Sequence, residues 1–152
     1  MKHLKIGDAA PSFSAKDQNG NLISSEGFKG KKLVIYFYPK DMTPGCTNQA
    51  CNLRDNYQVL QDKGIQILGV SADDEKRHQK FIDKYDLPFP LLADTDHEVI
   101  KAFGVWGEKK FMGKVYDGIH RTTFLINEDG NIHSIIEKPK VKAHAEEILE
   151  LF

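Results

Sequence analysis

Long apolar runs are missing from this sequence. The longest uninterrupted one covers residues 33–38, whereas a membrane-spanning helix needs roughly 20 consecutive apolar residues. Residues 1–11 also lack the apolar core of a secretory signal. We therefore expect a cytoplasmic protein that has no membrane partner.

An excess of charge of either sign is absent as well. The chain has 21 Lys and Arg residues against 22 Asp and Glu residues, a net charge of −1, and the two signs are interspersed along its length. Nucleic acids and anionic lipid surfaces are bound through a concentration of positive charge, so we expect neither as a partner. The even balance is compatible with a small substrate that need not be charged.

Cysteine is scarce, with two residues in a chain of 152. A chain of this length can bury a sufficient core as one domain without disulfides, and we expect a single domain over residues 1–152. No repeat, low-complexity tract or linker interrupts it. In a reducing cytoplasm, two cysteines are more often catalytic or redox-sensing than structural.

Histidines in metal-binding spacing are also lacking. No His-x-His or His-Glu-x-x-His pattern and no Cys-x(2)-Cys companion accompanies the histidines of the chain, so we expect no metal site. The chemistry proposed below needs no organic cofactor either. The six histidines are His3, His78, His97, His120, His133 and His144.

What the chain does contain is an alternation of strand and helix patterns. The apolar run Leu33–Tyr38 and the similar run Ile65–Ser71 are typical of buried strands, and the segment between them predicts a helix that extends to about Lys63. A strand, a helix and a second strand in this order form a right-handed parallel crossover, which indicates an α/β fold. Helices are expected over 73–85, 97–103 and 141–152, and antiparallel strands at 121–126 and 131–136. Asn and Gly residues indicate tight hairpin turns at 17–20 and, between those two strands, at 127–130.

The segment Val105–His120 fits neither pattern. It is rich in glycine, aromatic residues and lysine, and it shows no sustained helical period. A connection of this length in a compact domain is usually functional or contains a strand. The sequence alone does not decide between the two.

The two cysteines follow the first buried strand. Pro39 ends that strand, and the turn signal of residues 43–45 opens a helix, which places Cys46 in the first helical turn. Unpaired N–H groups and the positive end of the helix dipole favour an anion there, so a thiol ionises more readily and becomes a nucleophile. The alternative is a small, buried, inert cysteine. Cys51 either captures the product formed at Cys46 or is simply a core-facing position of the helix.

The segment YFYPKDMTPGCTNQACNLRD, together with GVWGEKKFMGKVYDGIHRTTFLI further on, resembles the peroxiredoxins. The resemblance covers nearly the whole chain and is to the Q-type subfamily, the bacterioferritin comigratory proteins. Its most specific element is Pro-x(3)-Thr-x(2)-Cys, here Pro39, Thr43 and Cys46. The resemblance implies a thioredoxin-like α/β fold, in which helices flank a central mixed β-sheet on both faces, and reduction of hydroperoxides through a sulfenic acid.

The resemblance also implies roles for five residues. Cys46 would be the peroxidatic cysteine, and Cys51 the resolving cysteine that forms a disulfide within the same helix. Thr43 would help to hold the peroxide oxygens, and Pro39 would shield the pocket. Arg121 matches the active-site arginine of the family, whose fixed charge would stabilise a thiolate and the leaving oxygen. Taken singly, Thr43 is better explained as a turn or helix-cap residue. Pro39 can be a simple strand stop and still shield the pocket, and an exposed strand-end charge at Arg121 would be unremarkable.

The resulting hypothesis is a monomeric peroxidase that reduces hydrogen peroxide and organic hydroperoxides. A Cys46–Cys51 disulfide would follow the sulfenic acid, and thioredoxin or a similar dithiol would restore both thiols. Two alternatives stay open. A thioredoxin-like thiol-disulfide oxidoreductase shares the fold, although such enzymes use Cys-x(2)-Cys where this chain has Cys-x(4)-Cys. A non-enzymatic redox-sensing module is compatible with the fold alone.

Overall fold

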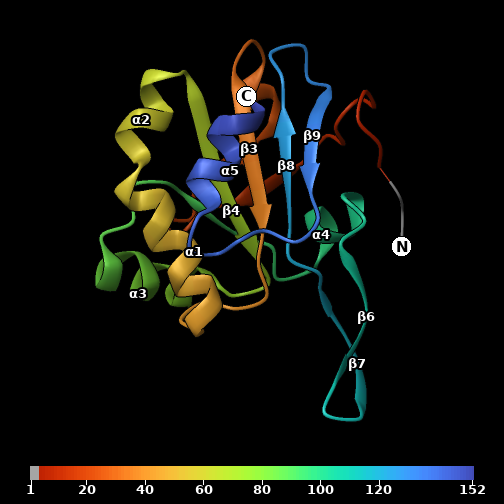
Figure 1. Cartoon of the computed structure of the whole chain (residues 1–152). Helices are drawn as coiled ribbons and strands as arrows, with labels where there is room; N and C mark the ends of the chain where they lie inside the picture. Colours follow the sequence, from red (N-terminus) through yellow and green to blue (C-terminus); the bar gives the residue numbers. More distant parts are fainter. Residues whose placement is uncertain (1–3) are drawn as a thin grey trace.

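A five-stranded mixed sheet forms the centre of the molecule in the computed structural model, which describes residues 4–152 (Figure 1). In spatial order its strands are β5 (Leu91–Ala93), β4 (Ile65–Ser71), β3 (Lys32–Phe37), β8 (Thr122–Ile126) and β9 (Ile132–Ile136). The strands β3, β4 and β5 run parallel to one another. The strand β8 is antiparallel to β3, and β9 is antiparallel to β8.

The central strand β3 forms from the apolar run expected to be a strand. β-Branched and aromatic side chains favour the extended backbone, and a strand inside a sheet that is covered on both faces buries its side chains on both sides. Val34 and Tyr36 belong to the apolar core on one face of the sheet. Leu33, Ile35 and Phe37 belong to the core on the other face. The side-chain alternation of β3 therefore supplies both cores.

Helices cover both faces of the sheet. In chain order they are α1 (Pro44–Asp55), α2 (Tyr57–Asp62), α3 (Glu75–Tyr85), α4 (Glu98–Ala102) and α5 (His144–Leu151). The helices α1, α2, α3 and α5 contribute Leu53, Leu60, Phe81 and Ile148 to one core. The helix α4 closes the other core with Ile100. The expected mixed sheet with helices on both faces is confirmed.

The single helix predicted to reach about Lys63 was wrong, because the structure contains two helices there. Asn56 separates them with φ −110° and ψ 12°, outside the helical region. Its side-chain Nδ2 donates a hydrogen bond to the carbonyl oxygen of Asn52 at 2.9 Å. An asparagine side chain that competes for a helical carbonyl in this way disfavours the continuing helix.

The undecided segment at residues 105–120 is a β-hairpin. Its strands β6 (Trp106–Phe111) and β7 (Lys114–Ile119) pair antiparallel around Met112 and Gly113. Most of its side chains are exposed on both faces, so no alternation of apolar and polar residues marks the strands in the sequence. In Figure 1 the hairpin projects beyond the end of the sheet at which β3 terminates.

Two tight turns expected from their Asn and Gly residues are confirmed. Residues 17–20 join β1 (Ser14–Lys16) to β2 (Leu22–Ser24), and residues 127–130 join β8 to β9. In each turn, the first side chain accepts hydrogen bonds from the backbone N–H groups two and four residues on. The short 3₁₀ helix η1 (Ser25–Phe28) follows β2.

Two other predicted helices form with shifted starts. The carboxylate of Asp74 caps α3 by accepting the backbone N–H of Arg77 at 2.8 Å, and α5 begins at His144, three residues after the expected start. Among residues 4–152, no helix combines the length and the apolar character that crossing a bilayer requires. His3, considered above as a metal ligand, lies outside these residues.

Candidate active site

Cys46 lies at the junction between the central strand and α1. The strand β3 ends at Phe37, and Thr43 caps the helix in an extended conformation, with φ −79° and ψ 154°. The backbone N–H of Thr47 donates to the carbonyl oxygen of Thr43 at 2.9 Å, so Cys46 is in the first helical turn. Its thiol is free and only 1% of the residue is exposed. The adjacent helix N-terminus favours negative charge on the sulfur.

The guanidinium of Arg121 lies against this sulfur. Its Nη2 is 3.2 Å from Sγ of Cys46, and its Nη1 donates to Oε1 of Gln49 at 2.5 Å. Because a guanidinium can only donate, the amide oxygen of Gln49 must face it. The amide nitrogen Nε2 then points away, buried and without a partner among residues 4–152. Two contacts in different directions thus orient a permanent positive charge at the sulfur.

A glycine provides the space for this guanidinium. A Cβ atom added to Gly45 would lie 3.2 Å from Nη2 of Arg121, closer than an ordinary carbon–nitrogen contact. Gly45 therefore permits the arginine to approach the first turn of α1. The glycine of the turn signal has a packing role in addition to its place at the helix start.

Thr43 and Pro39 lie at the same end of the sheet. The hydroxyl of Thr43 donates to the carbonyl oxygen of Lys40 at 2.9 Å. With its proton engaged there, the hydroxyl oxygen keeps lone pairs that can accept a hydrogen bond. Pro39 is half-buried, two residues after the end of β3. The fold thus collects Pro39, Thr43, Cys46 and Arg121 in one region.

A buried polar network anchors the loop between β3 and α1. The hydroxyl of Tyr38 donates to Asp41 at 2.5 Å, and the second carboxylate oxygen of Asp41 lies 2.6 Å from Nδ1 of His78. Nε2 of His78 is 2.8 Å from the carbonyl oxygen of Leu92, and the backbone N–H of Asp41 donates to Asp73. Ligand atoms of Asp41, Asp73 and His78 lie within 4.8 Å of one another. Since each already has a protein partner, we interpret the cluster as a loop anchor.

Sequence reasoning missed Gln49, although a signal for it exists. Gln49 is three residues after Cys46, a spacing that places two side chains on the same side of a helix. A polar residue there, completely buried, can orient whatever group approaches the thiol. Its partner could not be read from the helix, because Arg121 is 75 residues away from Cys46 in the chain.

Two further neighbours of Cys46 gave no sequence signal. Burial raises the pKa of Tyr36 well above its usual value, the negative charge of Cys46 adds to the increase, and its hydroxyl has no partner among residues 4–152. The hairpin brings Lys109, whose Nζ donates to the carbonyl oxygen of Ile119 at 2.9 Å. Partial burial, followed by the charge of Arg121, lowers the pKa of Lys109, whereas Cys46 opposes that shift. A second cation therefore lies in the electrostatic surroundings of the thiol.

Cys51 is half-buried on the same helix as Cys46. The helix α1 is continuous through both residues. Cα atoms five residues apart in an α-helix are separated by about 9 Å, whereas a disulfide tolerates at most about 6.8 Å. The two sulfurs can therefore bond only if part of α1 unwinds.

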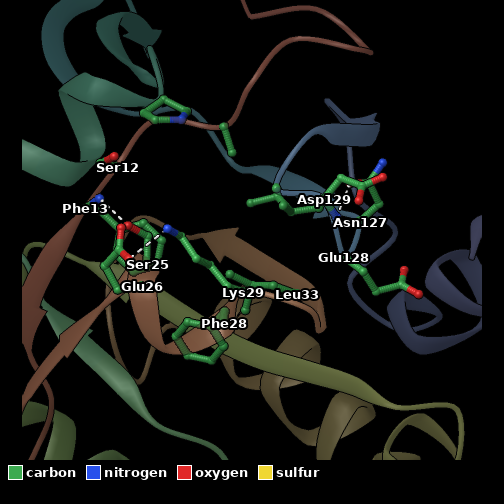
Figure 2. A pocket seen from close by; sticks show the side chains of 14 residues that line it. Ser12, Phe13, Ser25, Glu26, Phe28, Lys29, Leu33, Asn127, Glu128 and Asp129 are labelled. Atoms are coloured by element: carbon green, nitrogen blue, oxygen red, sulfur yellow. Dashed lines mark hydrogen bonds and ion pairs between the residues drawn. The ribbon is translucent and has the colours of Figure 1, made fainter.

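The hollow drawn in Figure 2 lies at the opposite end of the sheet. It encloses about 340 Å³, and Phe13, Phe28 and Leu33 form part of its wall. Leu33 is near the start of β3, whereas Cys46 follows the end of that strand. An ion pair between Glu26 and Lys29, 2.9 Å long, borders the hollow. This cavity is separate from the thiol site.

Comparison with known proteins gives similarity over nearly the full length. Residues 6–135 match the family described as AhpC/TSA. A putative peroxiredoxin Bcp of Haemophilus influenzae is 51% identical over 150 residues, covering 99% of this chain and 97% of that protein. Peroxiredoxin Bcp of Escherichia coli is 50% identical over 149 residues, covering 98% and 96% of the two chains.

A solved structure is similar as well. It is a bacterioferritin comigratory protein of Xanthomonas campestris, studied for its alkyl peroxide reduction activity. The TM-score is 0.85 at 37% sequence identity, and the match covers 91% of this chain and 88% of that chain. The similarity therefore extends from the sequence to the arrangement of the elements.

Proposed function

The chain belongs to the AhpC/TSA family of peroxiredoxins, with peroxiredoxin Bcp and peroxiredoxin Q among its relatives, and we propose that it reduces hydrogen peroxide and organic hydroperoxides through Cys46. Membership confirms the resemblance and the thioredoxin-like fold expected from the sequence, and it makes the protein a thiol peroxidase. The observation that supports the residue assignment is the 3.2 Å contact between Arg121 and the sulfur of Cys46. Organic substrates are supported by the alkyl peroxide reduction activity of the Xanthomonas campestris relative.

In the first half-reaction the Cys46 thiolate attacks one peroxide oxygen. A sulfur–oxygen bond forms and the oxygen–oxygen bond breaks, so the other oxygen leaves with the electron pair, takes up a proton and departs as water or an alcohol. The sulfur loses two electrons and becomes a sulfenic acid. Arg121 stabilises the thiolate and then the charge on the leaving oxygen. Thr43 accepts a hydrogen bond from the peroxide hydroxyl, and Pro39 shields the pocket from water.

In the second half-reaction Cys51 resolves the sulfenic acid. Its thiolate attacks the sulfur of Cys46, a disulfide forms, and the hydroxyl leaves as water after protonation. A protein dithiol such as thioredoxin then attacks one sulfur and forms a mixed disulfide. Its second thiol displaces the enzyme, so the partner leaves oxidised and both cysteines return as thiols. This cycle is that of an atypical 2-Cys peroxiredoxin.

We also propose that a single domain carries the whole cycle as a monomer in the cytoplasm. Both apolar cores are closed by elements of this one chain. Both cysteines are free thiols, and both belong to the helix α1. No step of the cycle uses a metal or an organic cofactor.

Two serine variants test the assignment. After one equivalent of hydrogen peroxide, intact-mass measurement should show that the wild type loses two hydrogens and that Cys51→Ser gains one oxygen, because it stops at the sulfenic acid. Cys46→Ser should keep its mass, since Cys51 lacks the arginine and the helix N-terminus. The two variants are matched controls for each other.

Two results would contradict the assignment. Equal oxidation of both variants in a single turnover would remove Cys46 from its role as the nucleophile. A wild type that keeps all its thiols under peroxide, but exchanges disulfides with a protein substrate, would identify a thiol-disulfide oxidoreductase instead.

A further inference from the structure

The hairpin formed by β6 and β7 ends in an apolar tip that no helix or strand of residues 4–152 covers. We call residues 109–116 the hairpin tip. Four large side chains in it are exposed to solvent: Phe111 to 65%, Met112 to 87%, Val115 to 58% and Tyr116 to 48%. In Figure 1 this tip is the part of the molecule that projects farthest from the sheet. The strand register places Phe111 and Tyr116 on one face of the ribbon and Val115 on the other. Two exposed aromatic side chains on one face indicate an interaction site more often than isolated apolar residues do.

The charges of the hairpin tip are all positive. Lys109, Lys110 and Lys114 lie within it, and it contains no acidic residue. The acidic residues nearest in sequence are Glu108 and Asp117, which pair with each other across the two strands immediately before and after the tip. The chain as a whole has a net charge of −1, so its overall composition does not reveal this local cluster of positive charge. A partner of opposite charge would be attracted to it.

The turn of the hairpin has an unfavourable conformation for one of its residues. Met112 has φ 51° and Gly113 has φ 79°, which are left-handed conformations typical of two-residue hairpin turns. Glycine adopts this region readily, whereas a residue with a Cβ atom does so at a free-energy cost. Met112 is also the most exposed of the four apolar side chains. Neither its packing nor its backbone accounts for a methionine at this position.

The base of the hairpin adjoins the redox site. The strand β7 runs directly into His120 and Arg121, and Arg121 contacts the sulfur of Cys46. Lys109, at the lower limit of the tip, turns its ammonium group back to the carbonyl oxygen of Ile119, so Lys110 and Lys114 are the exposed lysines of the tip. The tip therefore projects from the same end of the sheet as the first turn of α1, which holds Cys46.

We propose that the hairpin tip is the docking site of the dithiol protein that reduces the Cys46–Cys51 disulfide. The partner's cysteine pair would be bordered by apolar and acidic side chains, which would match the exposed aromatic residues and the lysines of the tip. This proposal rests on the proposed function, because only a disulfide formed in the catalytic cycle needs such a partner. The partner's first thiolate attacks the disulfide and its second thiol releases the enzyme.

The size of the tip favours a transient partner over a permanent one. Stable protein interfaces involve roughly 20–30 residues on each side, whereas redox encounters use smaller areas. The tip is a narrow two-stranded ribbon that supplies residues 109–116 only. Aromatic anchors surrounded by complementary charge can give such a small contact its specificity. A second copy of this chain would also bring lysine against lysine.

Serine substitutions at the tip separate docking from chemistry. Phe111→Ser and Tyr116→Ser should each lower kcat/KM for thioredoxin by about tenfold, as the loss of an interface anchor does. Turnover with dithiothreitol, which needs no docking surface, should equal that of the wild type, as should single-turnover oxidation by peroxide. The matched control is Val59→Ser on α2, an exposed apolar side chain far from the hairpin.

Charge reversal gives a second, independent measurement. Lys110→Glu should lower kcat/KM for thioredoxin at low ionic strength, and the difference from the wild type should shrink as salt is added. The control is Lys31→Glu, which changes the net charge equally but precedes β3 at the opposite end of the sheet. That variant should recycle like the wild type.

Four outcomes would overturn the proposal. If the tip variants are recycled by thioredoxin at the wild-type rate, docking is elsewhere and the proposed function stands. If thioredoxin does not recycle even the wild type, whereas dithiothreitol does, the reductant of the proposed function is wrong and the docking site with it. An equal loss with both reductants would mean that the hairpin acts on the thiol site. Self-association or binding to anionic vesicles that the tip variants lose, without a thioredoxin defect, would identify a second copy or a lipid surface as the occupant.

Discussion

At the scale of single residues, the proposed reactivity of Cys46 relies on the guanidinium of Arg121, which two contacts hold in place. Arg121 donates to Gln49 through Nη1 while Nη2 lies 3.2 Å from the sulfur, and Gly45 leaves room for it. A lysine has a single ammonium group at the end of a flexible chain and cannot occupy both positions. The ability of a cation to stabilise the Cys46 thiolate should therefore depend on its geometry as well as on its charge.

Arg121→Lys should slow the oxidation of Cys46 about 100-fold, the usual effect of removing one aligned donor from a developing negative charge. Rapid-mixing measurement of a single turnover with hydrogen peroxide, in the Cys51→Ser background, isolates this step. Arg54→Lys on the same helix is the control, because Arg54 bonds to the carbonyl oxygen of Tyr85 and not to the thiol. A wild-type rate in Arg121→Lys would show that the contact with Cys46 does not contribute to peroxide reduction.

At the scale of elements, the helix α1 has two incompatible tasks. Intact, it keeps Cys46 in its first turn beside Arg121, but it holds Cys51 too far away for a disulfide. In the proposed cycle the reduced helix is therefore the form that meets peroxide, and the disulfide form would have to be partly unwound. Unwinding would also expose the disulfide to the reductant, so one transition links the two half-reactions.

A side chain next to Cys51 extends this transition to another helix. Oδ1 of Asn52 accepts the backbone N–H of Ala145 at 2.7 Å, and its Nδ2 donates to the carbonyl oxygen of Lys142 at 3.1 Å. Asn52 thereby satisfies one of the unpaired donors at the start of α5. If the turn that contains Asn52 unwinds, α5 loses this cap.

Disulfide formation should therefore lower amide protection in two places. Hydrogen exchange of the oxidised protein should accelerate across Thr47–Arg54 and at the Ala145 amide, while β3 remains protected. Cys51→Ser, oxidised to the sulfenic acid, should keep the exchange pattern of the reduced protein, because it cannot form the disulfide that requires α1 to unwind. Undiminished protection of Thr47–Arg54 in the disulfide form would exclude unwinding, and Cys51 would then have to resolve another bond.

At the scale of the whole molecule, one buried histidine links stability to pH. His144 is fully buried at the start of α5, where Nε2 lies 2.9 Å from the hydroxyl of Thr123. Burial lowers the pKa of His144 below its ordinary value of 6.5, although Glu147, 3.1 Å from Nδ1, opposes the shift. His144 therefore becomes protonated at a higher pH in the unfolded chain than in the folded protein. Its contribution to stability is complete above about pH 6.5 and is lost as the pH falls.

His144→Gln should reduce this pH dependence. Between about pH 7.5 and 5.5, the free energy of unfolding of the wild type should fall more steeply than that of the variant, by at most about 1.4 kcal/mol for each pH unit. Urea unfolding of the reduced proteins gives both slopes. The comparison is of slopes, because the substitution also removes buried contacts, and His78 is present in both proteins. Parallel slopes would refute the assignment to His144.

The sequence by itself determined the parts of the site that are built locally. The strand β3, the turn before α1 and the position of Cys46 in a first helical turn were all predictable, because each depends on patterns within about ten residues. The tight turns at residues 17–20 and 127–130 were predictable for the same reason. These signals concern the preferences of a short stretch of backbone and need no distant partner.

Only the tertiary structure decided which residues meet at the sulfur. Thr122 pairs with Phe37 across β8 and β3, so Arg121 emerges at the end of the sheet where the chain turns toward Cys46, 75 residues earlier. That register, the break at Asn56 and the path of the hairpin depend on long-range packing and on side-chain competition for backbone groups. A short stretch of sequence does not reveal these long-range contacts, because they depend on differences in free energy between whole arrangements of the chain.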